Sequence, residues 1–248
     1  MPDAPAALRV GFLGTRGEID ATSERHRRHS VLLLTLRDQR VMIDCGLDWL
    51  DDIDRLSPDA IVVTHAHPDH AGGLRRGAPC PVYATEEAWR AIDRYGIRER
   101  IVVRPRASID VCGLRFEAFA VEHSLHAPAV GYRVSGGDVT LFYVPDVVSI
   151  PERGEALAGL RLYVGDGATV TRPIVRRRDG ALIGHAPIRA QLDWCAAEGV
   201  PWAIFTHCGS QLVRGEAEGL AARVEAMGRE RGMLAEIASD GMEVTLTS

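Results

Sequence analysis

Short runs of apolar residues rich in valine, isoleucine and leucine recur along the chain, and each is stopped by glycine, aspartate or a pair of charged residues. Runs of this length and composition predict β-strands rather than helices. The polar residues 37–39 separate two such runs and predict a hairpin, so the chain should open with antiparallel strands. The predicted strands cover residues 8–13, 30–36, 40–43, 60–63, 81–83, 114–121, 129–134, 139–144, 161–164, 202–206 and 242–246.

Helical patterning appears in residues 85–95, 188–198 and 215–231, the last of which is rich in alanine, glutamate and arginine. Strands and helices therefore alternate in both halves of the chain, which predicts an α/β protein. No stretch is long, polar or proline-rich enough to be an interdomain linker, so residues 1–248 are predicted to form a single domain. Each half runs strands first and helices after, which suits two similar sheets packed face to face with helices outside.

The composition is that of a globular protein with one sizeable core, because 46% of the 248 residues are hydrophobic and 25% are charged. This balance excludes a fibre, a disordered tail and a membrane-spanning protein. The 29 basic and 34 acidic residues give a formal net charge of -5, too weak a field to recruit a nucleic acid or an anionic membrane. Any anionic ligand must therefore be held locally.

The five cysteines are an odd number without a CxxC pair, which argues against a disulfide framework and against a structural zinc knuckle. Residues 1–8 also lack the basic and long apolar segments of a signal peptide. We therefore expect a cytoplasmic protein in a reducing compartment.

The largest group of candidate metal-binding residues follows the predicted strand that ends at Thr64. His65 and His67 lie two residues apart on an extended strand end, so their side chains project to the same side and can chelate one cation. Asp69 and His70 follow where a helix begins and are placed to hold a second cation. Imidazole and carboxylate donors suit zinc, and also manganese or iron. Three histidines and an aspartate in six positions argue against an ordinary polar turn.

Further donors stand at the ends of later strands. His123, Asp146 and His207 each lie where a predicted strand gives way to a loop. Open α/β sheets collect their ligands at such positions. His126 competes with His123 for the same role. We prefer His123 because it ends the alternating strand, and expect His126 to be a loop residue or to face the substrate.

The HxHxDH motif at residues 65–70, followed in order by the three later donors, resembles the signature of the metallo-β-lactamase superfamily over nearly the whole chain. The resemblance implies an αββα sandwich of four layers, in which two mixed sheets pack face to face between outer helices. It also implies two divalent cations, with zinc expected and manganese or iron as alternatives. The implied ligands are His65, His67 and His123 for the first cation, Asp69, His70 and His207 for the second, and Asp146 for both.

Two such cations would activate a water molecule held between them, so the reaction would need no serine or cysteine nucleophile. Asp69 would bind a cation and also orient the resulting hydroxide. Charge developing on the substrate would be taken up by the cations.

Three more segments resemble the branch of the superfamily that contains ribonuclease Z and the cyclic-phosphate phosphodiesterase of phosphonate breakdown. They are the glycine-rich residues 11–17, the loop 123–133 and the pair Gly184-His185. The resemblance implies that His185 lies near the scissile phosphate, where it would donate a hydrogen bond or a proton; a polar residue at a helix start is the alternative. About twenty residues separate Asp146 from Asp166, too few for the arm with which ribonuclease Z grips transfer RNA, so processing of transfer RNA is disfavoured.

Two more aspartates and an arginine run complete the candidates. Asp44 and Asp166 follow strands and are predicted to accept hydrogen bonds that orient the ligand imidazoles, although either could simply make a turn. Arg176, Arg177 and Arg178 are predicted to lie in a loop between the two late catalytic segments, where they could clamp an anionic substrate.

The sequence therefore predicts a binuclear metal-dependent hydrolase, foremost a phosphodiesterase that acts on a small phosphodiester or cyclic phosphate. The alternatives are a carboxyl-ester, thioester or lactone hydrolase of the same fold, and a metal-binding sensor or scaffold without catalysis. The expected partner is a small anionic substrate, with no membrane and no stable nucleic-acid partner. The oligomeric state stays open, a homodimer included.

Overall fold

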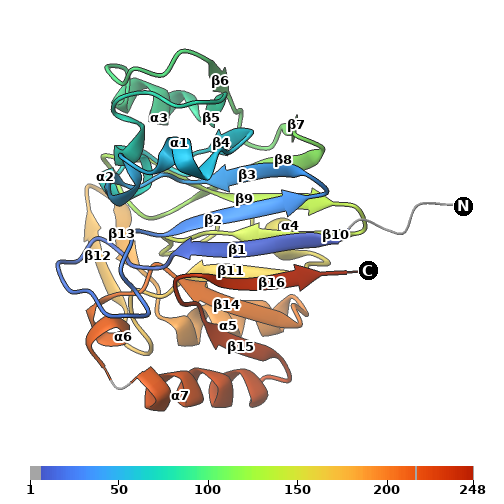
Figure 1. Ribbon diagram of the computed structural model, residues 1–248. Helices are drawn as coiled ribbons and strands as arrows, with labels where there is room; N and C mark the ends of the chain where they lie inside the picture. The colour runs from blue at the N-terminus through green and yellow to red at the C-terminus, as the bar shows by residue number, and fades with distance from the viewer. Residues whose placement is uncertain (1–6, 216, 248) are drawn as a thin grey trace, which may run out of the picture.

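Two seven-stranded mixed sheets lie face to face in the computed structural model, which describes residues 7–215 and 217–247 (Figure 1). The first sheet is built mainly from the N-terminal half of the chain, and its last strand along the sequence returns to its edge. In sheet order, its strands are β16 (Met242–Leu246), β1 (Leu8–Gly14), β2 (Val31–Leu36), β3 (Gln39–Ile43), β4 (Ala60–Val62), β5 (Val82–Ala84) and β6 (Arg100–Val102).

The second sheet repeats this plan apart from β16, which pairs antiparallel with β1, since in both sheets the earlier strands pair antiparallel and the later ones parallel. In sheet order, its strands are β15 (Leu234–Ile237), β14 (Trp202–Thr206), β11 (Leu162–Asp166), β10 (Val139–Tyr143), β9 (Ala129–Gly136), β8 (Leu114–Val121) and β7 (Ser108–Val111). A separate hairpin consists of β12 (Ile174–Arg178) and β13 (Ala181–His185).

Helices cover the outer face of each sheet. Trp49, Ile53 and Trp89 belong to one buried cluster with the first sheet, and Ile188 and Leu192 to another with the second. None of the described helices is both long and apolar enough to cross a membrane. The helices on the first sheet are η1 (Leu47–Trp49), α1 (Ile53–Leu56), α2 (Pro68–Ala71), η2 (Gly72–Leu74) and α3 (Glu86–Ala91); those on the second are α4 (Arg153–Leu157), α5 (Ile188–Ala197), α6 (Ser210–Arg214) and α7 (Ala217–Arg229).

A third apolar cluster fills the space between the sheets, with side chains such as Phe12 and Leu34 from one sheet and Leu141 and Tyr143 from the other. Strand β10 is buried on both faces, because its residue Phe142 packs outward among the helices. Strands covered on both faces read as continuous apolar runs, which is why the sequence revealed them. The αββα sandwich predicted from the sequence is therefore confirmed.

The structure corrects several predicted elements. The helix predicted over residues 215–231 is present as α7 over residues 217–229, and the short helix α6, which ends before the extended Gly215, was not predicted. Strands β6, β7, β12, β13 and β15 were not predicted. Strand β12 is exposed at all five residues, so it has no apolar periodicity by which a sequence could reveal it.

Two neighbouring tyrosines offer a stability test of the core between the sheets. Tyr132 and Tyr143 lie opposite one another on β9 and β10 and are fully buried. The Tyr132 hydroxyl donates to the Val63 carbonyl (3.0 Å), whereas the Tyr143 hydroxyl has no hydrogen-bond partner within the described ranges. Tyr132→Phe should lower the free energy of unfolding by about 1–2 kcal/mol, because it leaves a buried carbonyl unsatisfied.

Tyr143→Phe is the matched control and should leave that free energy unchanged or raise it, since it removes an unsatisfied group. Urea unfolding of both variants in chelator, followed by circular dichroism, measures the difference. Equal losses in the two variants would contradict the role given to the Tyr132 hydroxyl.

Candidate metal centre

A buried aspartate at the end of β3 organises the HxHxDH turn that follows β4. The Asp44 carboxylate accepts hydrogen bonds from the backbone NH of Thr64 (2.7 Å) and from its hydroxyl (2.9 Å). It also lies 2.8 Å from Nδ1 of His70, six residues further along the turn. One carboxylate thus joins the beginning of the turn to its end, and it leaves Nε2 of His70 free to face the other donors.

The first donor cluster consists of His65, His67, His123 and Asp146, whose ligand atoms all lie within 4.8 Å of one another. Nδ1 of His67 is 2.9 Å from Nε2 of His65 and 3.4 Å from Nε2 of His123. Asp146 Oδ2 lies 3.3 Å from Nε2 of His65. The other ring nitrogen of His123 is 3.0 Å from the Gly184 carbonyl, which fixes the orientation of the ring.

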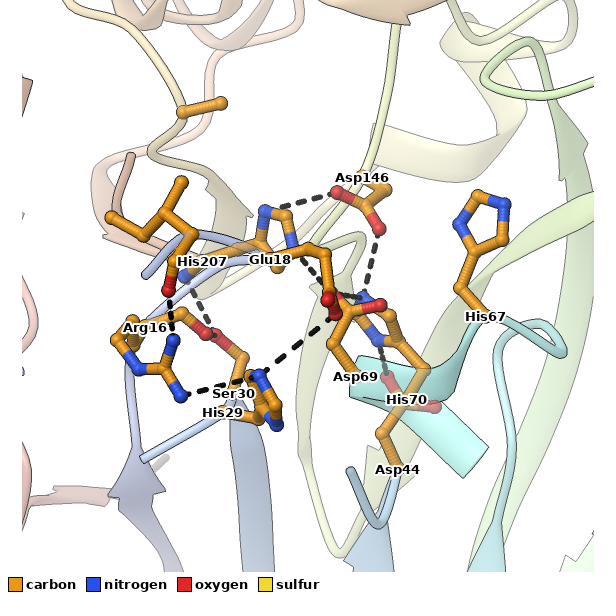
Figure 2. Close-up of polar contacts among 12 residues, drawn as sticks. Arg16, Glu18, His29, Ser30, Asp44, His67, Asp69, His70, Asp146 and His207 are labelled. Atoms are coloured by element: carbon orange, nitrogen blue, oxygen red, sulfur yellow. Dashed lines mark hydrogen bonds and ion pairs between the residues drawn. The ribbon is translucent and has the colours of Figure 1, made fainter. Parts of the chain in front are cut away.

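The second donor cluster shares Asp146 with the first and consists of Asp69, His70, Asp146 and His207. Asp69 Oδ2 is 3.1 Å from Nε2 of His70 and 3.0 Å from Nε2 of His207. Figure 2 shows Asp146 between these two histidines, with Oδ2 2.8 Å from His70 Nε2 and Oδ1 3.0 Å from His207 Nδ1. The structure thus brings together all seven residues that the sequence singled out.

His207 is held in an unusual backbone conformation directly after β14. Its φ is 51°, in the left-handed region that non-glycine residues rarely occupy. Its backbone NH donates to the Ser30 hydroxyl (2.9 Å), and Gly17 lies so close to the imidazole that a Cβ there would be 3.0 Å from the ring. Such strain persists only where the surroundings impose it, and it commonly marks a functional site.

Three buried atoms of the second cluster have no hydrogen bond within the described part of the chain, namely His70 Nε2, Asp146 Oδ1 and His207 Nδ1. Buried polar groups are normally satisfied, because an unsatisfied one costs the free energy of its desolvation. The two imidazole nitrogens lie on either side of the Asp146 carboxylate, His70 Nε2 at 2.8 Å from Oδ2 and His207 Nδ1 at 3.0 Å from Oδ1 (Figure 2). Imidazole nitrogens and carboxylate oxygens in this arrangement are the donors that divalent cations use, so the residues fit a metal site.

A second aspartate–histidine pair borders the two clusters. His185 is the last residue of β13, and its Nδ1 lies 2.7 Å from Asp166 Oδ2 and 3.4 Å from Asp146 Oδ1. The Asp166 carboxylate also accepts the backbone NH groups of Val147 (3.0 Å) and Ala168 (2.8 Å). Burial disfavours the charged form of His185, but Asp166 outweighs it and raises the histidine pKa. His185 does not start a helix, because α5 begins only at residue 188.

The pKa values of two donor histidines, one from each cluster, are shifted in opposite directions. Burial, reinforced by the neighbouring His123, lowers the pKa of His67 to about 4. Burial also disfavours the charged form of His207, but the carboxylates of Asp146 and Asp69 outweigh it and raise its pKa to about 10. A cation that enters the second cluster must therefore displace a proton from His207.

The arginine run was expected in a loop, and this prediction was wrong, because the three residues form the end of β12. Pairing with β13 places Arg176 and Arg178 on the hairpin face that carries His185, whereas Arg177 faces the other side. Arg176 and Arg178 line a cavity of about 320 Å³ together with His67 and His123. Arg177 does not line this cavity, and its guanidinium donates to the carbonyl of Gly180 (2.8 Å).

His126 is exposed at the rim of the same cavity, while His123 is buried against the donor cluster. The structure therefore brings His123, and not His126, to His67. The cavity lies directly beside the first donor cluster, so a substrate bound at the cluster would extend toward the two arginines.

The polar side chains of the loop between β1 and β2 were not predicted as part of the site. Arg16 is buried and paired with Asp48 (2.6 Å), and its guanidinium lies 3.3 Å from His29. Figure 2 shows Glu18 of this loop beside Asp69. Burial and the Asp69 carboxylate raise the pKa of Glu18, whereas burial lowers the pKa of His29 to about 4. The only available signal was the glycine-rich segment that precedes Glu18, and it does not indicate where the loop folds.

Residues 39–208 match the family model described as the Beta-lactamase superfamily domain. Ribonuclease Z of Methanopyrus kandleri is 28% identical over 177 residues, which cover 63% of this chain and 62% of that protein. The chain spans only 13% to 62% of the length of the first curated relatives that it matches.

Two solved structures share the fold over nearly the whole chain. The metallo-beta-lactamase fold protein YhfI from Bacillus subtilis aligns with a TM-score of 0.77 at 15% identity, covering 97% of this chain and 100% of that one. A diphosphatase from the PhnP family aligns with a TM-score of 0.70 at 20% identity, covering 97% of each chain. At these identities, the likeness concerns the fold alone.

Zinc added to chelator-treated protein should raise Tm, because the cation binds the folded chain. The rise should be larger at about pH 8 than at about pH 6, because protons compete with zinc for His207 more strongly at the lower pH. Differential scanning calorimetry measures both shifts. Asp146→Asn should remove most of the rise, and the exposed control His126→Ala should retain it. A rise of equal size in the two variants would show that zinc binds elsewhere.

Proposed function

The chain belongs to the beta-lactamase superfamily, and from this premise we propose that it is a binuclear metal-dependent phosphodiesterase acting on a small phosphodiester or cyclic phosphate. Its fold and family make it a metal-dependent hydrolase. The sharing of Asp146 by two adjacent donor clusters is the observation that carries the binuclear assignment. The proposed ligands are His65, His67 and His123 for one cation, Asp69, His70 and His207 for the other, and Asp146 for both, with zinc as the metal.

When bound, two divalent cations supply Lewis-acid activation of water and neutralise charge on phosphate oxygens. The residues of the chain position this chemistry. Asp69 Oδ2 lies between the two histidines of the second cluster, where it can accept a proton from the attacking water. Asp44 holds His70 through Nδ1 and thereby keeps its Nε2 directed at the cluster.

His185 is proposed as the proton donor to the leaving oxygen. Asp166 holds its Nδ1, so Nε2 is the ring nitrogen left to face a substrate. The carboxylate stabilises the imidazolium and sets its orientation. We propose that Asp166 acts through His185 as a positioning residue, whereas the sequence had predicted that it orients a ligand imidazole.

The surroundings favour a phosphoester over a carboxyl ester. A phosphodiester carries negative charge in its ground state, and Arg176 and Arg178 place two positive charges beside the first donor cluster. A neutral carboxyl ester or lactone would not need them. The acid function of His185 likewise suits an alkoxide leaving group.

The single domain over residues 1–248 and the cytoplasmic location remain predictions. The same holds for the absence of a stable nucleic-acid partner and for the homodimer that the sequence left open.

The function is tested by assaying the zinc-loaded protein with bis-p-nitrophenyl phosphate, p-nitrophenyl acetate and a lactone, each with a chelated control. We expect metal-dependent hydrolysis of the phosphodiester. His185→Asn should lower kcat by about 10²-fold or more with alkyl leaving groups, and less with nitrophenolate, which leaves without a proton. Activity on carboxyl esters alone would favour the ester hydrolase, and inactivity on all three would favour the sensor or scaffold.

The arginine face is tested with the double variant Arg176→Ala/Arg178→Ala and the matched control Arg177→Ala. The double variant should raise KM for a phosphodiester about fivefold, the scale of an exposed ion pair, while zinc content and kcat are retained. The control removes one positive charge, against two in the double variant, from the other face of the hairpin and should leave KM unchanged. An identical effect in both proteins would mean that the arginines act only through net charge.

A further inference from the structure

The donor clusters are bordered by a second cavity, distinct from the one beside His67 and the arginines. Its volume is about 340 Å³, and it lies beside His207, with His185 common to both cavities. Figure 2 shows His207 and Glu18 on one side of Asp146 and His67 on the other. A phosphodiester held at the clusters can therefore extend one ester arm into each cavity. Its lining includes Glu18, Ile19, Ile174 and His185.

The two cavities differ in charge. The first holds Arg176 and Arg178, whereas Glu18 is the only acidic or basic side chain of the second apart from its two histidines. Burial and Asp69 raise the pKa of Glu18, while the Arg16 guanidinium, which is paired with Asp48 at 2.6 Å, favours the charged carboxylate. Within the described ranges, the ion pairs of Glu18 are limited to His29 at 3.9 Å.

The shape of the second cavity suits a short aliphatic arm. The Glu18 side chain is 65% exposed, so an incoming group can reach its carboxylate. Ile19 and Ile174 contribute apolar walls, and Ile174 stands on the hairpin face that also carries His185. A carboxylate beside apolar side chains is complementary to a cationic amine on a short alkyl chain. In a mostly apolar pocket, a small number of charged groups is enough to fix the orientation of a ligand.

We propose that Glu18 forms a subsite for a positively charged amino group on one ester arm of the substrate, so that the enzyme prefers aminoalkyl phosphodiesters. The inference rests on the proposed phosphodiesterase function and specifies its substrate class. The arginine side then receives the other arm, and the opposite charges of the two cavities set the direction in which the diester lies.

The probes are p-nitrophenyl phosphocholine and its uncharged carbon isostere, p-nitrophenyl 3,3-dimethylbutyl phosphate, which share one leaving group and one shape. The wild-type enzyme should have a kcat/KM about three- to fivefold higher for the choline ester, the scale of a partly exposed ion pair. Glu18→Gln should abolish this preference through KM, with kcat retained. The matched control is Glu24→Gln, which removes the same charge from an exposed position of the same loop and should keep the preference.

Binding without turnover supplies an independent readout. Calorimetry of the zinc-loaded protein with phosphocholine and with 3,3-dimethylbutyl phosphate should give the lower Kd for phosphocholine, and Glu18→Gln should make the two values equal. Zinc content is measured in every variant.

The outcomes separate the inference from the proposed function. If neither diester is hydrolysed, the phosphodiesterase proposal fails, and the calorimetry still decides the subsite. If both are hydrolysed equally by wild type, only the subsite is overturned. If Glu18→Gln raises kcat/KM for both diesters, Glu18 repels anions in general. If Glu18→Gln loses zinc, Glu18 is a metal ligand. Either result overturns the inference.

Discussion

One buried carboxylate, Asp146, holds the candidate centre together. Five imidazoles surround it within 3.7 Å, contributed by His65, His70, His123, His185 and His207. A charge this deeply buried is costly unless other charges or cations compensate it. The surrounding segments must therefore meet at this point for the fold to tolerate the carboxylate at all. A cation shared between the two donor clusters would satisfy atoms that the protein leaves without hydrogen bonds.

The sandwich makes that convergence possible through the ends of its strands. The first sheet supplies Asp44 after β3 and the HxHxDH turn after β4, while the second supplies Asp146 and His207 after β10 and β14. The apolar layer between the sheets holds these strand ends in a fixed relation. The chemistry is therefore carried by loops, and their precision comes from strands that are buried on both faces.

The hairpin β12–β13 and the loop between β1 and β2 supply the side chains that surround the donor clusters on the substrate side. Neither belongs to the two sheets, and the hairpin is exposed along β12. They border the same donors with opposite charge, through Arg176 and Arg178 on one side and Glu18 on the other. The fold family accounts for the metal chemistry, and these two segments are where this chain can select its substrate.

The sequence by itself determined the buried strands of the two sheets and the donors, because buried strands are continuous apolar runs and residues 65–70 contain four ligands in six positions. It also placed His123, Asp146 and His207 at strand ends. Only the tertiary structure decided what the exposed segments do. Side chains alternate between the two faces of β12, so Arg177 lies on the opposite face from Arg176 and Arg178. Glu18 lies close to Asp69, although about fifty residues separate them along the chain. Contacts between distant polar residues leave no periodic signal, since they depend on how whole elements pack.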